Sequence, residues 1–225
     1  MLYIGEKIKN IVERIEKAKS AAGRSAPVKL VAVTKTVPPE AVEESLKYGI
    51  TDIGESRIQE AEKKLPALTA YKVKKHLIGH LQTNKARKAV ALFDVIQSVD
   101  SLRLLEEIDR HAAAAKKIQE CFLEVKISLE DTKFGLAPEM LAGLLDKSKT
   151  LGNVKVAGLM AMATFFDDPE SARPYFREAY RCYTQLSGSY ALDWLSMGMT
   201  GDFEVAVEEG SNMVRIGTGI YGEKK

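Results

Sequence analysis

The sequence of 225 residues predicts an α/β fold, a (β/α)8 TIM barrel with an extra N-terminal helix. Short β-branched or apolar runs alternate with charged stretches of helical periodicity, and this alternation favours a parallel sheet. Eight such runs follow one another, which favours a closed barrel over the alternative of an open, doubly wound sheet. The chain contains no linker or low-complexity tract, so residues 1–225 are expected to form a single domain.

The extra helix is expected at the N-terminus. Apolar residues recur there at helical spacing, with Glu and Lys between them: Ile4, Ile8, Ile11, Ile15 and Ala18. This pattern is typical of an amphipathic helix of about five turns. Gly23 and Pro27 are expected to end it.

The strands and the helices between them follow in order. Strands are expected at Lys29–Lys35, Ile50–Glu55, Lys75–Gly79, Asp94–Val99, Glu120–Ile127, Val154–Met160, Asp193–Met197 and Met213–Ile216. Helices are expected between them, for instance over Glu40–Tyr48, Leu102–Ala115, Pro138–Lys147 and Pro169–Leu186. Pro38 and Pro39 fall at the start of one helix, where proline is well tolerated.

Composition and charge argue against several classes of function. With 33 basic and 31 acidic side chains the formal net charge is +2, so no overall charge selects nucleic acid or an anionic membrane. The longest nearly apolar stretch, Ala157–Phe166, is too short to span a bilayer. The N-terminus is charged, unlike a signal peptide, and Cys121 and Cys182 form no C-x-x-C pair. A soluble cytoplasmic protein with no nucleic-acid or membrane partner is therefore expected.

The barrel prediction directs attention to the C-terminal ends of the strands, where such folds carry their active sites. Lys35 closes the apolar first strand. A lysine amine forms Schiff bases with carbonyl compounds, and partial burial or a cationic neighbour favours its neutral, nucleophilic form. The alternative is an ordinary solvated lysine at a strand end.

The last strand leads into a glycine-rich segment, in which Gly217, Gly219 and Gly222 formally match G-x-G-x-x-G. A dinucleotide fingerprint requires a helix and a further strand after it, and too few residues remain here for either. We instead expect a tight turn whose backbone N–H groups face an anion such as a phosphate. An ordinary turn that closes the barrel is the alternative.

Two polar side chains accompany this segment. Arg215 alternates with Val214 and Ile216 in the last strand, so it points to the opposite face and needs an acidic partner or a ligand. Ser196 ends the seventh strand, where its hydroxyl could share the same phosphate. The histidines show no metal-ligand spacing, so no metal site is expected.

Taken together, these residues resemble the pyridoxal phosphate homeostasis protein family, single-domain relatives of the N-terminal barrel of alanine racemase. The resemblance covers ordered stretches along almost the whole chain: Leu30–Thr36, Gly54–Glu60, His76–Lys85, Ser98–Ser101, Gly158–Met160, Leu195–Asp202 and Val214–Thr218. It implies that the cofactor is pyridoxal 5'-phosphate and that Lys35 holds it as a Schiff base. It also implies that Arg215 faces the pyridine nitrogen. The residues implied at the phosphate are Ser196, Gly217 and Thr218.

Two positions depart from the family's pattern. Ser56 stands where the second-strand motif Gly-Glu-Asn-Arg has asparagine, so a contact near the cofactor is expected to be lost or taken over by water. Ser56 is still counted among the expected cofactor-binding residues. Thr200 stands where the motif Met-Gly-Met-Ser has serine, and it keeps a hydroxyl.

An arginine at the pyridine nitrogen disfavours protonation of that nitrogen and makes the ring a weaker electron sink. The resemblance thus implies a carrier that buffers the cofactor and passes it to apoenzymes, with no catalytic residue assigned. The alternative is an amino-acid racemase of the alanine racemase type. In alanine racemase the second acid/base comes from a C-terminal domain and the partner subunit. Because this sequence has no such domain, the carrier is favoured, a monomer is expected, and only weak racemase-like activity is left open.

Overall fold

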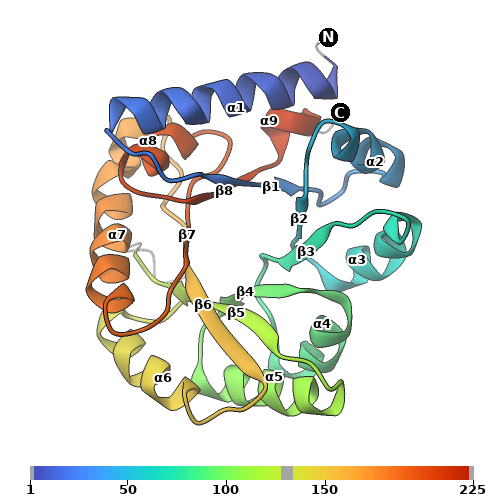
Figure 1. Cartoon of the computed structure of the whole chain (residues 1–225), viewed down its shortest axis with the longest axis vertical. Helices are drawn as coiled ribbons and strands as arrows, with labels where there is room; N and C mark the ends of the chain where they lie inside the picture. The colour runs from blue at the N-terminus through green and yellow to red at the C-terminus, as the bar shows by residue number, and fades with distance from the viewer. Residues whose placement is uncertain (1–2, 128–133, 223–225) are drawn as a thin grey trace.

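A computed structural model describes residues 3–127 and 134–222 and has the expected architecture (Figure 1). Its eight parallel strands pair in chain order and close into a barrel. The strands are β1 (Lys29–Val33), β2 (Asp52–Glu55), β3 (Lys74–Leu77), β4 (Val95–Val99), β5 (Gln119–Val125), β6 (Val154–Ala161), β7 (Trp194–Ser196) and β8 (Met213–Ile216). The predicted α/β class and TIM barrel are confirmed.

Helices follow the strands and surround the barrel. They are α1 (Ile4–Ala21), α2 (Pro39–Lys47), α3 (Ile58–Lys64), α4 (Ala86–Leu92), α5 (Leu102–Ala114), α6 (Leu141–Ser148), α7 (Arg173–Ser187), α8 (Phe203–Glu208) and α9 (Thr218–Tyr221). Short 3-10 turns are η1 (Leu65–Leu68), η2 (Thr83–Lys85), η3 (Pro138–Met140) and η4 (Pro169–Ala172). The two predicted helices that begin at Pro138 and Pro169 therefore each start as a 3-10 turn before continuing as α6 and α7.

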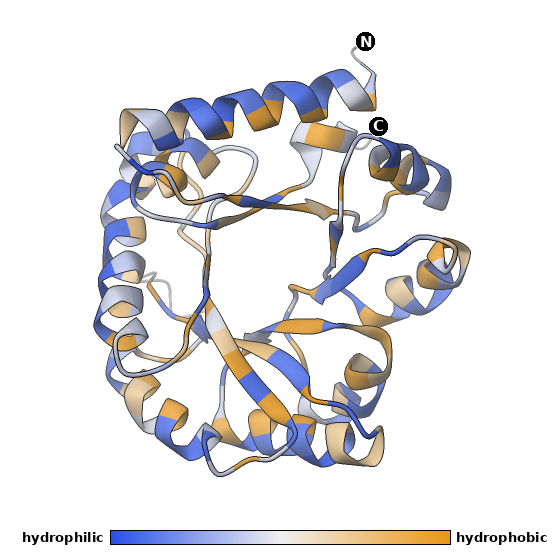
Figure 2. Ribbon diagram, viewed as in Figure 1, coloured by the Kyte–Doolittle hydropathy of each residue, from blue (hydrophilic) through white to orange (hydrophobic). Residues whose placement is uncertain are grey.

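The predicted N-terminal helix is α1, which lies outside the eightfold repeat. Its apolar stripe is buried, with Ile8, Ile11 and Ile15 each no more than 4% exposed. It packs against α2, α8 and α9, and Figure 1 shows it lying across α8 and α9. Hydrophobic and hydrophilic residues alternate along it in Figure 2, as an amphipathic helix requires. It thereby joins the first and last units of the barrel.

The barrel closes between β1 and β8, with Val31 opposite Arg215. On its other side β1 pairs with β2, with Val33 opposite Gly54. Because all three strands run in the same direction, the residues that follow them meet at one end of the barrel. Lys35 is therefore brought next to the segment after β8, from which most of the chain separates it.

The segment after β8 differs in one respect from the expected tight turn. It forms the short helix α9, which begins at Thr218 and ends at Tyr221, with Gly222 as its C-cap residue. Gly222 has a φ of +86°, a left-handed conformation that glycine adopts without strain, and its N–H donates to the carbonyl oxygen of Thr218. The expected tight turn thus takes the form of a single turn of helix.

Apolar side chains form two clusters, one on each face of the sheet. The larger cluster lies between the strands and the surrounding helices, and it includes Ile53, Leu123 and Phe176. The smaller cluster lies inside the barrel and comprises Val31, Val95, Phe122, Ala157, Met160 and Met213. Buried polar side chains share this interior with the smaller cluster, and they connect it to the C-terminal end where the predicted site lies.

Candidate functional site

A pocket of about 860 Å³ opens at the C-terminal ends of β1, β2 and β8. Four of the six predicted cofactor-binding residues line it, namely Lys35, Ser56, Gly217 and Thr218. Further lining residues are Val33, Val37, Pro38, Ala41, Arg57 and Tyr221. Glu60 lines the pocket as well and pairs with Arg57 at 3.4 Å, so the pocket combines an amine, hydroxyl groups, an ion pair and an apolar wall.

The end of β1 sets the position of Lys35, whose side chain is exposed. Thr36 has a φ of +63°, a left-handed conformation that is uncommon for a β-branched residue and often found at functional sites. The Thr36 N–H donates to Glu60 Oε2 at 3.1 Å. The chain therefore turns sharply immediately after Lys35, at the wall of the pocket.

A buried ion pair contacts Thr34, the residue immediately before Lys35. Lys64 Nζ donates to Glu55 Oε1 at 2.6 Å and also to the carbonyl oxygen of Thr34. Thr34 Oγ1 donates to the same Glu55 oxygen at 2.7 Å. The side chains of Lys64 and Glu55 are 8% and 1% exposed. We call Thr34, Glu55 and Lys64 the β1 clamp, because together they hold the peptide group that precedes Lys35.

Ser56 is held in place by a close backbone contact with Gly79. A Cβ atom on Gly79 would lie 2.2 Å from the Ser56 carbonyl oxygen. Gly79→Ala is therefore expected to lower the free energy of unfolding by about 2 kcal/mol, because backbone atoms must move to admit the methyl group. Denaturant unfolding measures this change.

A matched control for that substitution is Gly143→Ala in α6, where a Cβ atom would meet no atom within 4 Å. Alanine is expected to raise the unfolding free energy there by roughly 0.5–1 kcal/mol, since glycine weakens a helix interior. If Gly79→Ala unfolds at the same denaturant midpoint as the wild type, the contact with Ser56 does not constrain the site.

Arg215 lies inside the barrel, below the pocket rather than in its lining, and is 3% exposed. Its Nη1 donates to Ser196 Oγ at 2.7 Å and its Nη2 to the Ala161 carbonyl oxygen at 3.0 Å. Burial lowers the pKa of Arg215 to about 10, although Glu124 and Asp202 oppose this change. Among residues 3–127 and 134–222 no carboxylate forms a salt bridge with Arg215, so its direct partners there are neutral oxygens.

Glu124 is a second ionisable group inside the barrel, and sequence reasoning assigned it no role. It follows the interior residue Phe122 by two positions in β5, so alternation turns it inward as well. Burial raises its pKa to about 7; the negative charge of Asp100 adds to this effect, and Arg215 opposes it. The signal that could have revealed it is an acidic residue between the apolar Leu123 and Val125, at the C-terminal end of a buried strand.

The hydroxyl groups of Thr200 and Ser196, both singled out in the sequence, lie at different depths in the barrel. Thr200 Oγ1 accepts a hydrogen bond of 3.2 Å from the N–H of Gly219, beside Gly217 and Thr218. Ser196 is fully buried below them, and its Oγ donates to Gln97 Oε1 at 2.7 Å. The phosphate role of Ser196 stays a prediction, while Thr200 is the hydroxyl that the fold brings against the Gly217–Gly219 segment.

The described part of the chain contains no group of three His, Cys, Asp or Glu side chains arranged to hold a metal ion. Over the same residues, no helix has both the length and the apolar character needed to cross a membrane.

His80 lies at the same end of the barrel as the pocket. It pairs with Asp100 at 3.3 Å and stacks on Phe134 with ring centroids 3.7 Å apart.

A model of the family "Alanine racemase, N-terminal domain" matches residues 7–225. The chain is 42% identical to the pyridoxal phosphate homeostasis protein of Aquifex aeolicus, over 98% of each chain. It is 37% identical to the protein of the same name from Pseudomonas aeruginosa, over 100% of this chain and 97% of that one. This chain belongs to the pyridoxal phosphate homeostasis protein family. The resemblance inferred from its motifs is confirmed.

Solved structures place this family member among similar barrels. PipY of Synechococcus elongatus, in a structure with PLP bound, has a TM-score of 0.82 and 36% identity, over 94% of this chain and 100% of that chain. An unknown protein from Bifidobacterium adolescentis has a TM-score of 0.89 and 34% identity, over 96% and 94%. The alanine racemase of Clostridium difficile, at 14% identity and a TM-score of 0.71, shares the fold over 95% of this chain and 56% of its own length.

Proposed function

We propose that this chain binds pyridoxal phosphate reversibly in the pocket at the end of β1, with Lys35 holding it as a Schiff base. The observation that carries the proposal is that one pocket gathers an amine, Lys35, and an anion-binding candidate, the Gly217–Thr218 segment. The relative PipY, 36% identical, is described with PLP bound. We further propose that the protein serves as a carrier in cofactor homeostasis.

The chemistry of the pocket fits this ligand. When bound, pyridoxal phosphate supplies an aldehyde carbon that an amine can attack with loss of water. Lys35 supplies the amine, which must lose its proton to act as the nucleophile. Gly217, Thr218 and Ser56 supply backbone and hydroxyl donors for a phosphate. The guanidinium of Arg57 lies in the same lining, where it pairs with Glu60 at 3.4 Å. Val33 belongs to the apolar wall against which an aromatic ring can pack.

Two buried groups complete the proposed site. We assign Arg215 to the side of the pyridine nitrogen, where a permanent cation keeps that nitrogen unprotonated. Ser196 is assigned to this region as well, beneath the ring, where it accepts from Arg215; its hydroxyl proton is bonded to Gln97, so a contact with the phosphate would have to displace that bond. Both residues lie within the barrel just below the strand end that leads to Gly217.

The arrangement of Tyr221 favours a carrier over a racemase. Racemisation needs a second acid/base opposite the lysine, and Tyr221 is the tyrosine in the pocket lining. Its hydroxyl is engaged with Ser45 Oγ at 2.9 Å, and burial raises its pKa to about 12. A tyrosine with such a pKa is poorly matched to proton abstraction near neutral pH.

Borohydride reduction followed by peptide mapping tests the Schiff base. The expected result is a single reduced adduct on the peptide that contains Lys35, and its loss in Lys35→Ala. Lys47→Ala, which removes an exposed lysine at the end of α2, is the matched control and should keep the adduct. Reduction at any other lysine, or a protein that forms no visible imine band, would refute the assignment.

Exchange at the α-carbon separates the carrier from the racemase. The loaded protein is incubated with L-alanine in deuterated water, and deuterium uptake is followed by mass spectrometry. A carrier is expected to give no more uptake than free pyridoxal phosphate, whereas turnover at an enzymic rate would favour the racemase.

Three further parts of the proposal concern the protein in the cell. We propose that it acts as a monomer, that it resides in the cytoplasm, and that it passes its cofactor to apoenzymes. The free, buried thiols of Cys121 and Cys182 agree with a reducing compartment. The exposed position of Lys35 agrees with exchange of the ligand with other proteins.

A further inference from the structure

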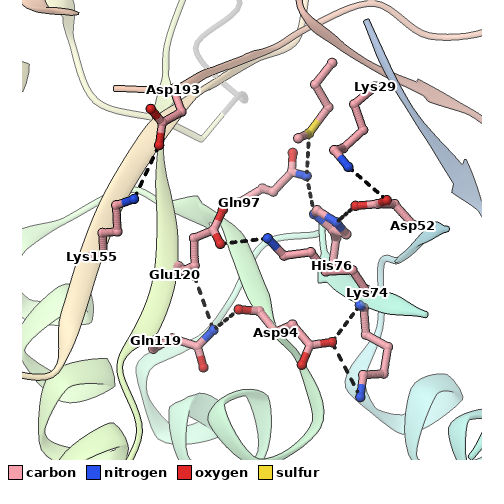
Figure 3. A network of polar contacts seen from close by, with 12 residues as sticks. Lys29, Asp52, Lys74, His76, Asp94, Gln97, Gln119, Glu120, Lys155 and Asp193 are labelled. Carbon is pink, nitrogen blue, oxygen red and sulfur yellow. Dashed lines mark hydrogen bonds and ion pairs between the residues drawn. The ribbon is translucent and has the colours of Figure 1, made fainter. Parts of the chain in front are cut away.

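A continuous chain of hydrogen-bonded side chains crosses the barrel interior from β2 to β8. Asp52 Oδ1 lies 2.9 Å from His76 Nε2, and His76 Nδ1 lies 2.9 Å from Gln97 Nε2 (Figure 3). Gln97 Oε1 accepts a hydrogen bond of 2.7 Å from Ser196 Oγ, which in turn accepts one of 2.7 Å from Arg215 Nη1. All five side chains are buried. We call Asp52, His76, Gln97, Ser196 and Arg215 the barrel file.

The donor and acceptor at each step of the barrel file follow from the charge of Asp52. Although burial opposes it, hydrogen bonds from His76 and Thr51 lower the pKa of Asp52 to about 2, so its carboxylate only accepts. His76 must then donate from Nε2. Burial lowers the pKa of His76, so its ring is neutral near pH 7 and Nδ1 is an acceptor.

The orientation of the Gln97 amide follows from these donor and acceptor roles. Its NH₂ group has to face His76 Nδ1, and the other amide proton points to Met213 Sδ at 3.4 Å. Its oxygen therefore faces Ser196 and takes the only hydroxyl proton that Ser196 has. The remaining lone pairs of Ser196 face Arg215. Every bond of the file thus donates in one direction, from Arg215 towards Asp52.

We propose that Gln97 is a positioning residue for Arg215, acting through Ser196, and that His76 and Asp52 fix the orientation of its amide. Gln97 contacts neither the pocket nor the ligand proposed for it. Its role is to keep a hydroxyl oxygen, rather than a hydroxyl proton, turned towards the guanidinium. The inference rests on the proposed function, since Arg215 is assigned there to the pyridine nitrogen.

Two substitutions at the same position test the proposal with opposite expectations. Gln97→Met keeps the volume but leaves the Ser196 hydroxyl proton without its acceptor, so the hydroxyl can rotate and no longer holds a lone pair in a fixed direction towards Arg215. We expect pyridoxal phosphate to dissociate about tenfold faster from this variant, with a shifted visible imine band. Gln97→Glu keeps an acceptor for Ser196, and His76 can take up a proton to donate from both ring nitrogens to the carboxylates on either side of it. The dissociation rate and the band should therefore stay close to those of the wild type.

A role in packing alone predicts the reverse order. A buried thioether is well tolerated in an apolar interior, whereas a buried carboxylate is costly. The proposal is overturned if Gln97→Met behaves as the wild type, or if Gln97→Glu is the more strongly affected variant. Gln119→Met, which removes another buried glutamine whose amide bonds backbone oxygens outside the file, should leave the imine band unchanged.

A measurement on the protein without cofactor keeps this inference separate from the proposed function. In ¹⁵N NMR the two Nη groups of Arg215 should give separate signals in the wild type and in Gln97→Glu, because the guanidinium is held. They should merge through faster rotation in Gln97→Met. If the wild type forms no imine, the proposed function fails, and these signals alone decide whether Gln97 positions Arg215. Identical signals in all three proteins would overturn it.

Discussion

Replacing Lys64 with methionine is expected to lower the free energy of unfolding by about 3–5 kcal/mol, because the substitution leaves the buried Glu55 carboxylate without its cation. The Glu55 side chain is 1% exposed, and its Oε2 atom already has no hydrogen-bond partner among the described residues. Lys64 also holds the Thr34 carbonyl oxygen. The loss therefore combines an unpaired buried charge with a freed peptide group next to Lys35, and denaturant unfolding measures it.

Two further variants separate the charge from the packing. Lys88→Met removes a lysine from a surface ion pair with Glu62, whose side chains are 55% and 36% exposed, and should cost no more than about 1 kcal/mol. In the double variant Lys64→Met with Glu55→Leu, both members of the pair are apolar and most of the lost stability should return. If the double variant is as unstable as Lys64→Met alone, the unpaired charge does not explain the effect, and loss of packing or of the bond to the Thr34 carbonyl oxygen does.

Glu124→Gln is expected to stabilise the protein in alkaline solution and not in acid. Burial raises the pKa of Glu124 to about 7, from the value of 4.5 that is ordinary for a glutamate. A carboxyl group whose pKa is raised by folding contributes its full stability below the unfolded value and loses it as the pH rises through the folded value. A glutamine does not ionise, so above about pH 7 the variant should be more stable by on the order of 3 kcal/mol.

Unfolding curves taken across this pH range test that expectation. The two proteins should have similar stability below about pH 5, since the wild-type carboxyl group is then neutral as well. Glu139→Gln, which changes an exposed carboxylate beside α6, serves as the control and should follow the wild type throughout. A constant difference between Glu124→Gln and the wild type at every pH would show that Glu124 does not ionise in this window.

The order and type of the elements could be predicted because their signals are local. The helical spacing of the isoleucines in α1 and the apolar run of β1 can be recognised without knowledge of the rest of the chain. Ends of elements were less accurate, because they depend on contacts made elsewhere. The predicted strand Asp193–Met197 is shortened to Trp194–Ser196, since the chain bends away at Gly198, whose φ is +92°.

The candidate site likewise contains some residues that could be predicted from local sequence and others that could not. Lys35, Ser56, Gly217 and Thr218 could be brought together in advance because the ends of neighbouring parallel strands share one end of a barrel. Lys64 lies in helix α3, and nothing in its spacing shows that its amine reaches back to Thr34. Gln97 and His76 likewise acquire their hydrogen-bond partners only when their strands pair around the closed barrel. Such contacts between distant residues cannot be inferred from local pattern.

Closure of the barrel between β1 and β8 has a consequence for protein synthesis. Lys35 leaves the ribosome early, whereas Gly217 and Thr218 follow only after most of the chain has been made. A ligand that bridges the two segments cannot be retained by the nascent chain, and it stabilises the finished barrel alone. A copy truncated before Gly217 would lack one side of the pocket and could gain no stability from the ligand.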